Sequence, residues 1–295
     1  MKDYLPESMR RCPPGYTRGE LERAMEDGTI LTARAVRCDE THDLIIDLGC
    51  AEGRIPRLEA AEGVADGRTR EIAILRCVGR PVCACEITPE GEIVLSRRKA
   101  QQLAMDHLLR EAAPGDILPV VVTGCTAFGA FCDVGCGAAA LLGTQQLCIS
   151  RLRHAGEMLT PGQRIYAAIR TLDRVQRRVF LTQRELLGTW AENAARFCAG
   201  QTVTGVVRSL TDYGAFIELT PNLSGLAEDN GTLRVGDHVA VYIRAIVPET
   251  LKIKLSVLHR VEPQPREPLR YFQTEGHIRQ WRYGNEEYAK YYTIF

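Results

Sequence analysis

The stretch AFGAF at residues 127–131 returns as DYGAF at residues 212–216, and this repeated phrase decides the fold. The two segments that carry it open on Gly115 and Gly200, so they recur at an interval of about 85 residues. A fainter copy of the segment begins at Gly28. Because solenoid proteins repeat shorter units, an interval of this length indicates whole small domains in series. The sequence therefore predicts several copies of one domain.

Each segment holds five short strand-like runs that are separated by glycine-rich turns. A parallel α/β sheet would need a helix after nearly every strand, and these segments show none. We therefore predict a mainly β protein of three small, closed five-stranded barrels. In the clearest copy the expected strands span 117–124, 131–134, 138–142, 164–172 and 178–182.

The expected domain boundaries follow from these segments and from helical runs between them. The barrels are placed at 28–97, 114–183 and 199–259, and short linker helices at 98–113 and 184–198. Residues 1–27 form an N-terminal extension. Residues 260–295 form a proline-containing linker and an aromatic-rich C-terminal segment.

Composition limits the classes of function. Among 295 residues, 37 are Lys or Arg and 37 are Asp or Glu, so the formal net charge is zero. A protein that coats nucleic acid by bulk charge would be strongly basic, so any such binding must use local patches and aromatic faces. The 11 cysteines include no Cys-x-x-Cys pair and no histidine at zinc-like spacing, so we expect reduced thiols and no metal site.

Targeting and cofactor signals are also lacking. Residues 1–15 carry charges and three prolines without an apolar run, so we expect no signal peptide. We expect no membrane span, no membrane partner and a cytoplasmic location, since no apolar stretch approaches membrane-spanning length. The sequence holds neither a phosphate loop nor a dinucleotide fingerprint, so we expect no cofactor and no small-molecule substrate.

The strand pattern and the aromatic-Gly-Ala-Phe phrase together resemble the RNA-binding OB-fold repeat named after ribosomal protein S1. The second repeat resembles it best over 115–183, including the loop at 151–157 and the closing hairpin at 173–182. The third repeat resembles it over 200–256, and the first chiefly at 93–99. The resemblance implies three tandem OB-folds that bind single-stranded RNA, as in short bacterial homologues of that ribosomal protein.

The resemblance also implies particular site residues. Its aromatic platforms fall on Phe128, Phe131, Tyr213 and Phe216, where flat rings can stack on bases. The glycine inside each phrase is expected to permit a bend or bulge that brings both rings outward. Cations near this face would contact phosphates; the candidates are Arg151, Arg170, Arg177, Arg208, Arg244 and Lys252. The family's third-strand histidine is replaced by Gly143 and Glu228.

Two parts of the chain depart from this pattern. Residues 39–44 of the first repeat read DETHDL, with three acids and no platform, so we expect this barrel to be structural or to bind protein. The tail is expected to pack on the third barrel, the alternative being an RNA-stacking arm. Its aromatic residues are Tyr271, Phe272, Trp281, Tyr283, Tyr288, Tyr291, Tyr292 and Phe295.

The leading functional hypothesis is non-catalytic binding of single-stranded RNA, in particular messenger RNA, in translation at the small ribosomal subunit. One alternative is an accessory factor in RNA processing, although the chain has no separate catalytic domain and no clustered acids suited to two metals. Another is a protein–protein scaffold of degenerate barrels, which the neutral charge and the missing histidines would suit.

Overall fold

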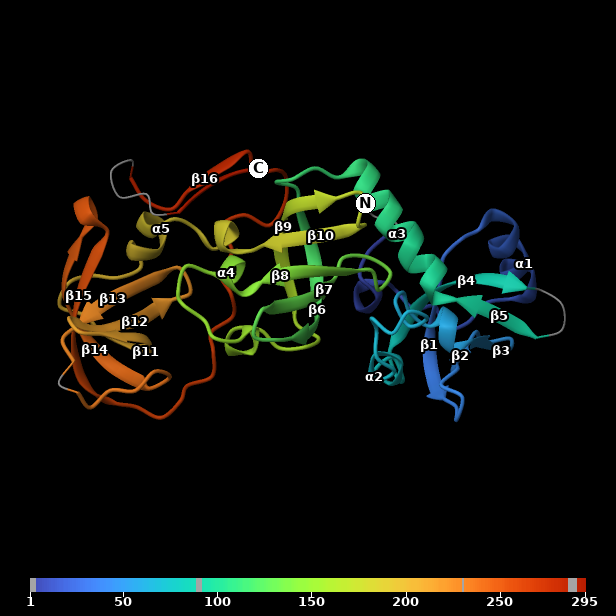
Figure 1. Ribbon diagram of the computed structural model, residues 1–295, viewed down its shortest axis with the longest axis horizontal. Helices are drawn as coiled ribbons and strands as arrows, with labels where there is room; N and C mark the ends of the chain where they lie inside the picture. The colour runs from blue at the N-terminus through green and yellow to red at the C-terminus, as the bar shows by residue number, and fades with distance from the viewer. Residues whose placement is uncertain (1–3, 89–91, 230, 286–290) are drawn as a thin grey trace.

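The computed structural model describes residues 4–88, 92–229, 231–285 and 291–295, and it contains three closed barrels in a row (Figure 1). The first barrel comprises β1 (Leu31–Cys38), β2 (Leu44–Asp47), β3 (Glu52–Ile55), β4 (Pro81–Thr88) and β5 (Ile93–Ser96). The second comprises β6 (Ile117–Cys125), β7 (Gly129–Asp133), β8 (Ala139–Gly143), β9 (Arg164–Asp173) and β10 (Arg178–Thr182). The third comprises β11 (Thr202–Thr211), β12 (Gly214–Thr220), β13 (Leu223–Ala227), β14 (His238–Val247) and β15 (Lys252–Arg260).

All three barrels share one topology. The first three strands form an antiparallel meander, and the third strand then pairs in parallel with the fifth. The fourth strand closes the barrel against the first. This arrangement confirms the predicted fold class, three tandem OB-fold barrels. It follows from the alternation of apolar and polar residues along each strand, which buries one face in a core.

Short helices cover and connect the barrels. The helices are α1 (Arg18–Asp27), α2 (Ile72–Leu75), α3 (Arg97–Glu111), α4 (Thr144–Leu147) and α5 (Trp190–Ala194). Single 3₁₀ turns are η1 (Glu7–Met9), η2 (Arg57–Glu59), η3 (Ala155–Glu157), η4 (Arg184–Leu187) and η5 (Pro248–Thr250). No helix in these described ranges is both long and apolar enough to cross a lipid bilayer. The eleven cysteines are all free thiols, and most are buried or half-buried.

The first linker is one continuous helix. In α3, the Ser96 side chain caps the N-terminus by accepting a hydrogen bond from the Lys99 amide, 2.8 Å. The helix starts directly at the end of β5 and runs from the first barrel to the second (Figure 1). Its buried face, which includes Ala104 and Leu108, joins the core of the second barrel.

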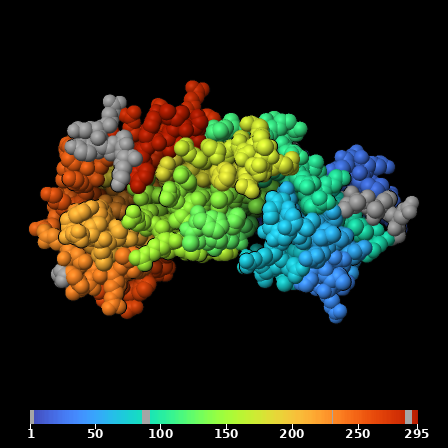
Figure 2. Space-filling view, in the orientation of Figure 1, coloured from blue at the N-terminus to red at the C-terminus, as the bar shows by residue number. Residues whose placement is uncertain are grey.

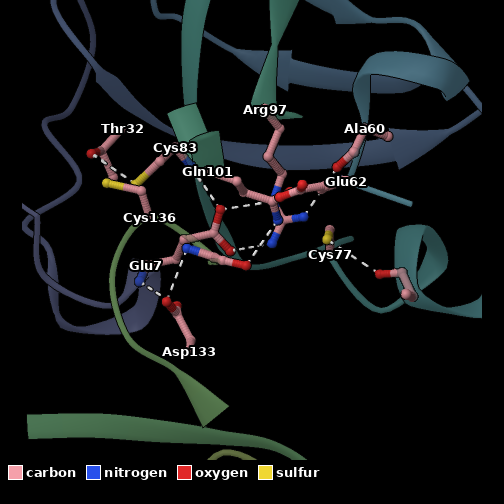
Figure 3. Close-up of polar contacts among 12 residues, drawn as sticks. Glu7, Thr32, Ala60, Glu62, Cys77, Cys83, Arg97, Gln101, Asp133 and Cys136 are labelled. Atoms are coloured by element: carbon pink, nitrogen blue, oxygen red, sulfur yellow. Dashed lines mark hydrogen bonds and ion pairs between the residues drawn. The ribbon is translucent and has the colours of Figure 1, made fainter. Parts of the chain in front are cut away.

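A buried polar network fixes the first barrel to the second (Figure 3). The Arg97 guanidinium donates to both carboxylate oxygens of Glu7, each at 2.7 Å, and to the carbonyl of Ala60 at 3.0 Å. The Glu7 amide in turn donates to Asp133 of β7 at 2.8 Å. Burial, and next the Glu7 carboxylate, raise the pKa of Asp133 to about 7. The N-terminal segment therefore ties the two barrels together, because the Glu7 carboxylate binds Arg97 and the Glu7 amide binds Asp133.

The second linker corrects the sequence prediction of one helix over 184–198. The chain instead forms η4, breaks at Gly188 and resumes as α5, five residues long. Gly188 has φ +84°, a conformation that favours glycine. A Cβ atom there would lie 2.5 Å from the Phe272 ring, so the C-terminal segment packs directly against this glycine.

The C-terminal segment packs on the third barrel, as the sequence predicts, and also on the second. The Tyr283 hydroxyl donates to the carbonyl of Asn222 in the third barrel at 2.6 Å. The Ile278 amide donates to Gly115 at the start of the second barrel at 2.9 Å. The segment ends in the two-stranded sheet β16 (Gln280–Arg282) and β17 (Tyr292–Ile294), and Tyr288 lies outside the described residues.

Candidate nucleic-acid interface

Two aromatic rings project together from the second barrel. Phe128 lies in the turn before β7 and is 61% exposed, whereas Phe131 lies on the outer face of β7 and is 38% exposed. Their ring centroids are 5.8 Å apart at an interplanar angle of 86°, an edge-to-face pair. Two large apolar rings left in solvent side by side, with free faces, can stack on unpaired bases.

The third barrel repeats this arrangement. Tyr213 is 67% exposed in the turn before β12, and Phe216 lies half-buried on that strand. Their ring centroids are 6.1 Å apart, again at 86°. The sequence prediction placed the aromatic pairs on these four residues, and the structure brings each pair together on the outside of its barrel.

The glycine in each phrase is required for a reason other than the predicted bulge. A Cβ atom on Gly129 would lie 2.5 Å from the Leu142 carbonyl oxygen, and one on Gly214 would lie 2.3 Å from that of Ala227. The glycines thus allow the neighbouring strand to pass close to the aromatic turn. The register shifts are on the partner strands, between Val122 and Gly124 on β6 and at the matching place on β11.

A row of side chains across the sheet extends the platform of the second barrel. Phe131 pairs with Leu141 on β8, which pairs with Phe180 on β10, so the three side chains share one face. Phe180 is half-buried. The sequence analysis missed it, although the alternation of buried Val179 and Leu181 around it already indicates that it points outward.

The same row in the third barrel ends in a cation. Phe216 pairs with Leu226 on β13, which pairs with Lys254 on β15. Lys254 is exposed, and so is Lys252 two residues earlier on the same face. The third barrel therefore places an ammonium group where the second barrel places a third ring, an arrangement suited to contact a phosphate rather than a base.

The first barrel has no comparable platform. Its corresponding row contains Ile45 on β2, Arg54 on β3 and Val94 on β5, and Arg37 on β1 pairs with Ile45. The Arg54 guanidinium donates to Glu92 at 2.7 Å and to Asp43 at 2.9 Å, and Arg37 is paired with a glutamate of β3. These cations are neutralised by local acids and no aromatic residue stands in the row, as expected from the acidic turn at 39–43.

The predicted cations fall into two groups. Arg151 and Lys252 are exposed. Arg244 is exposed as well, with a guanidinium nitrogen 4.0 Å from the Glu228 carboxylate. An exposed pair at this distance contributes little, so these three side chains can turn toward a ligand.

The other predicted cations are engaged within the protein. Arg177 lies in the β9–β10 turn with φ +52° and pairs with Asp106 of α3. Arg170 donates to the carbonyl of Ile294 at 3.2 Å, and its guanidinium lies 5.7 Å from the centroid of the Phe295 ring. These two arginines hold the linker helix and the C-terminal segment against the second barrel.

Arg208 is buried, with 7% of its surface exposed, and binds two carboxylates. Its guanidinium donates to both oxygens of Glu218 at 2.8 and 3.0 Å and to Glu157 at 2.8 Å. These two carboxylates occupy the guanidinium, so Arg208 links the second barrel to the third. The sequence could not indicate this because Glu157 belongs to another barrel.

The described residues include no group of three or more His, Cys, Asp or Glu side chains placed to hold a metal. At the positions of the family's third-strand histidine, Gly143 ends β8 and Glu228 follows β13. His154 is exposed in the loop that follows β8 and α4, and its Nδ1 accepts a hydrogen bond from the Gly156 amide.

Comparisons with known proteins agree with this geometry. Residues 111–184, which contain the second barrel, match the family model of the S1 RNA binding domain. The small ribosomal subunit protein bS1 of Leuconostoc lactis is 29% identical over 247 residues, 77% of this chain and 56% of that protein. The bS1 protein of Staphylococcus aureus is 31% identical over 189 residues, 58% of this chain and 48% of that protein.

These matches confirm the resemblance predicted from the repeated phrase. The chain spans about half the length of the curated relatives it matches. Among solved structures, a multidomain protein with nucleic acid binding domains from Streptococcus pneumoniae is 13% identical, with a TM-score of 0.26. That alignment covers 81% of this chain and 76% of the other.

Proposed function

We propose that this protein binds single-stranded RNA through the outer aromatic rows of its second and third barrels, without catalysing a reaction. The observation that carries the proposal is the recurrence of one exposed edge-to-face pair, Phe128 with Phe131 and Tyr213 with Phe216. Burying large rings normally stabilises a domain, so exposing two of them in the same place in two barrels favours a binding role.

Ring stacking suits single strands of any sequence, because every base has a flat face and unpaired bases can turn toward the rings. The exposed Lys252 and Lys254 would contact phosphates beside the rings of the third barrel. The zero net charge limits long-range attraction, so we expect affinity to come from these local contacts and to fall with added salt.

The relatives named bS1 are proteins of the small ribosomal subunit, and this supports the finer proposal that the RNA is messenger RNA and that the small subunit is a partner. On that proposal the protein acts in translation, in the cytoplasm. The proposed function needs no cofactor, since binding by stacking and charge requires only the side chains described above.

The full chain should bind a fluorescently labelled oligouridine with micromolar or tighter affinity, and it should bind an RNA duplex of equal length much more weakly. Paired and stacked bases cannot reach the rings, which is the physical reason for the difference. Fluorescence anisotropy at low and at moderate salt measures both affinities. Equal affinity for the two RNAs would contradict ring stacking, and no binding to either would favour the scaffold alternative.

A further inference from the structure

The second and third barrels are joined rigidly by hydrogen bonds between the loop after α4 and the turn after β12. The Ser150 amide donates to the carbonyl of Pro221 at 3.0 Å, and the Ile149 amide donates to the Asn222 side chain at 3.1 Å. The Asn222 amide group donates back to the carbonyls of Arg184 and Gly188 at 2.7 and 2.8 Å. Bonds in both directions fix the relative position of the two barrels.

The loop at residues 151–157, here called the bridging loop, leaves this joint and contacts the aromatic turn of the second barrel. The Ala155 amide donates to the carbonyl of Thr126 at 2.9 Å. Thr126 precedes Phe128 by two residues in the same turn, and its hydroxyl and its amide both donate to the Gly129 carbonyl within that turn. One end of the bridging loop is therefore anchored beside the Phe128–Phe131 pair.

The other end of the bridging loop contacts the sheet of the third barrel. Glu157 accepts a hydrogen bond from Arg208, which also holds Glu218. Glu218 follows Phe216 by two residues on β12, so both side chains lie on the same face of the sheet. The second carboxylate oxygen of Glu157 accepts from the Arg153 amide at 3.2 Å. Glu157 and Arg208 thus position the loop beside β12, the strand that carries Phe216.

The bridging loop carries positive charge on its surface. Arg151 and Arg153 are exposed, and no partner for either guanidinium is found within the part of the chain that the structure describes. The two nearby carboxylates, Glu157 and Glu218, are both bound to Arg208. Figure 2 shows the yellow-green atoms of this part of the chain in contact with the orange atoms of the third barrel.

We infer that Arg151 and Arg153 guide the phosphate backbone of one RNA strand from the Phe128–Phe131 pair to the Tyr213–Phe216 pair, so that a single strand occupies both barrels. This inference rests on the proposed function and adds the binding mode. Because the joint is rigid, a strand that has bound one of these barrels finds the other already in place. The contact of the strand with that other barrel is then intramolecular. Arg208 and Glu157 are positioning residues for this path, and the two loop arginines contact the RNA.

The test compares labelled oligouridines from about 4 to about 24 nucleotides, because one OB barrel covers about 4–16 nucleotides. The affinity of the unaltered full chain should rise with length until a strand fills both barrels. In R151A/R153A, the longest strands should bind about 10-fold more weakly at low salt, and the slope of log affinity against log salt should shrink by about 1.4, which is two contacts at 0.7 each. The shortest strands should bind as before.

The matched control is R76A/R80A, which removes two exposed arginines from the first barrel and changes net charge equally. It should retain full affinity at every length. The inference is overturned if R151A/R153A binds long strands as the unaltered chain does, or if it weakens short and long strands alike. Absence of binding by the unaltered chain at every length would instead refute the proposed function, so the two failures are distinguishable.

Discussion

Phe128→Ala and Tyr213→Ala are each expected to weaken oligouridine binding about 10-fold, and the double variant about 100-fold. Each substitution removes the more exposed ring of its pair, and a stacked base is worth about 1–3 kcal/mol. Because both rings are largely in solvent, their loss should leave the barrels folded. Fluorescence anisotropy measures the affinities, and circular dichroism checks the fold.

Tyr292→Ala is the matched control for these variants. Tyr292 is 44% exposed on β17, in the C-terminal segment and outside the two aromatic rows. Its removal should leave RNA affinity unchanged. If Tyr292→Ala weakens binding as much as Tyr213→Ala does, the tail is an RNA-stacking arm, and the assignment of the platforms to the second and third barrels is wrong.

Arg97→Ala is expected to lower the free energy of unfolding by about 3–5 kcal/mol, the cost of breaking a buried ion pair by removing one partner. Only 8% of the Arg97 surface is exposed, and its loss leaves the Glu7 carboxylate buried beside Asp133. The first barrel should consequently lose its fixed attachment to the second. Urea unfolding followed by circular dichroism measures the change.

Arg98→Ala provides a neighbouring comparison on the same helix. Its guanidinium pairs with Glu59, but 41% of the Arg98 side chain is exposed, so we expect a loss of less than about 1 kcal/mol. An Arg97→Ala variant as stable as Arg98→Ala would show that the Glu7–Arg97 pair does not hold the junction together.

The barrels could be predicted from the sequence because their signals are local and repeated. Alternation along each strand fixes the buried face, and the aromatic phrase marks the same turn in two barrels. The break at Gly188 has a local signal that the prediction did not use, because Thr189 and Glu192 after the glycine form a capping box that starts a new helix. Contacts between residues far apart in the chain, such as Phe272 against Gly188, carry no local signal of this kind.

The same limit applies to the site residues. The aromatic residues were predictable because an exposed ring depends only on its own strand and turn. The use of each arginine depends on partners that are distant in sequence, as with Arg177 and Asp106 of the linker helix. Arg208 looks like a surface cation in sequence, yet Glu157 of another barrel and Glu218 of its own enclose it. Phe180 joins the row only through the parallel pairing of β8 with β10.

The three barrels share one fold, but they differ in the row of side chains across the outer face of the sheet. In the first barrel, Arg54 occupies the row and is held by acids on both sides. Binding RNA there would require breaking these pairs and bringing phosphate near carboxylates, which is costly. The core residues of the barrel do not depend on this row, so the barrel can fold without an aromatic row.

Ultraviolet cross-linking of oligouridine to the full chain, followed by mass spectrometry of the cross-linked peptides, tests the central claim most directly. A zero-length cross-link forms only where a base contacts a side chain, so it reports the contacting residues themselves. We predict cross-links at Phe128, Phe131, Tyr213 and Phe216, in peptides of the second and third barrels. Cross-links confined to the first barrel or to the C-terminal segment would contradict the account.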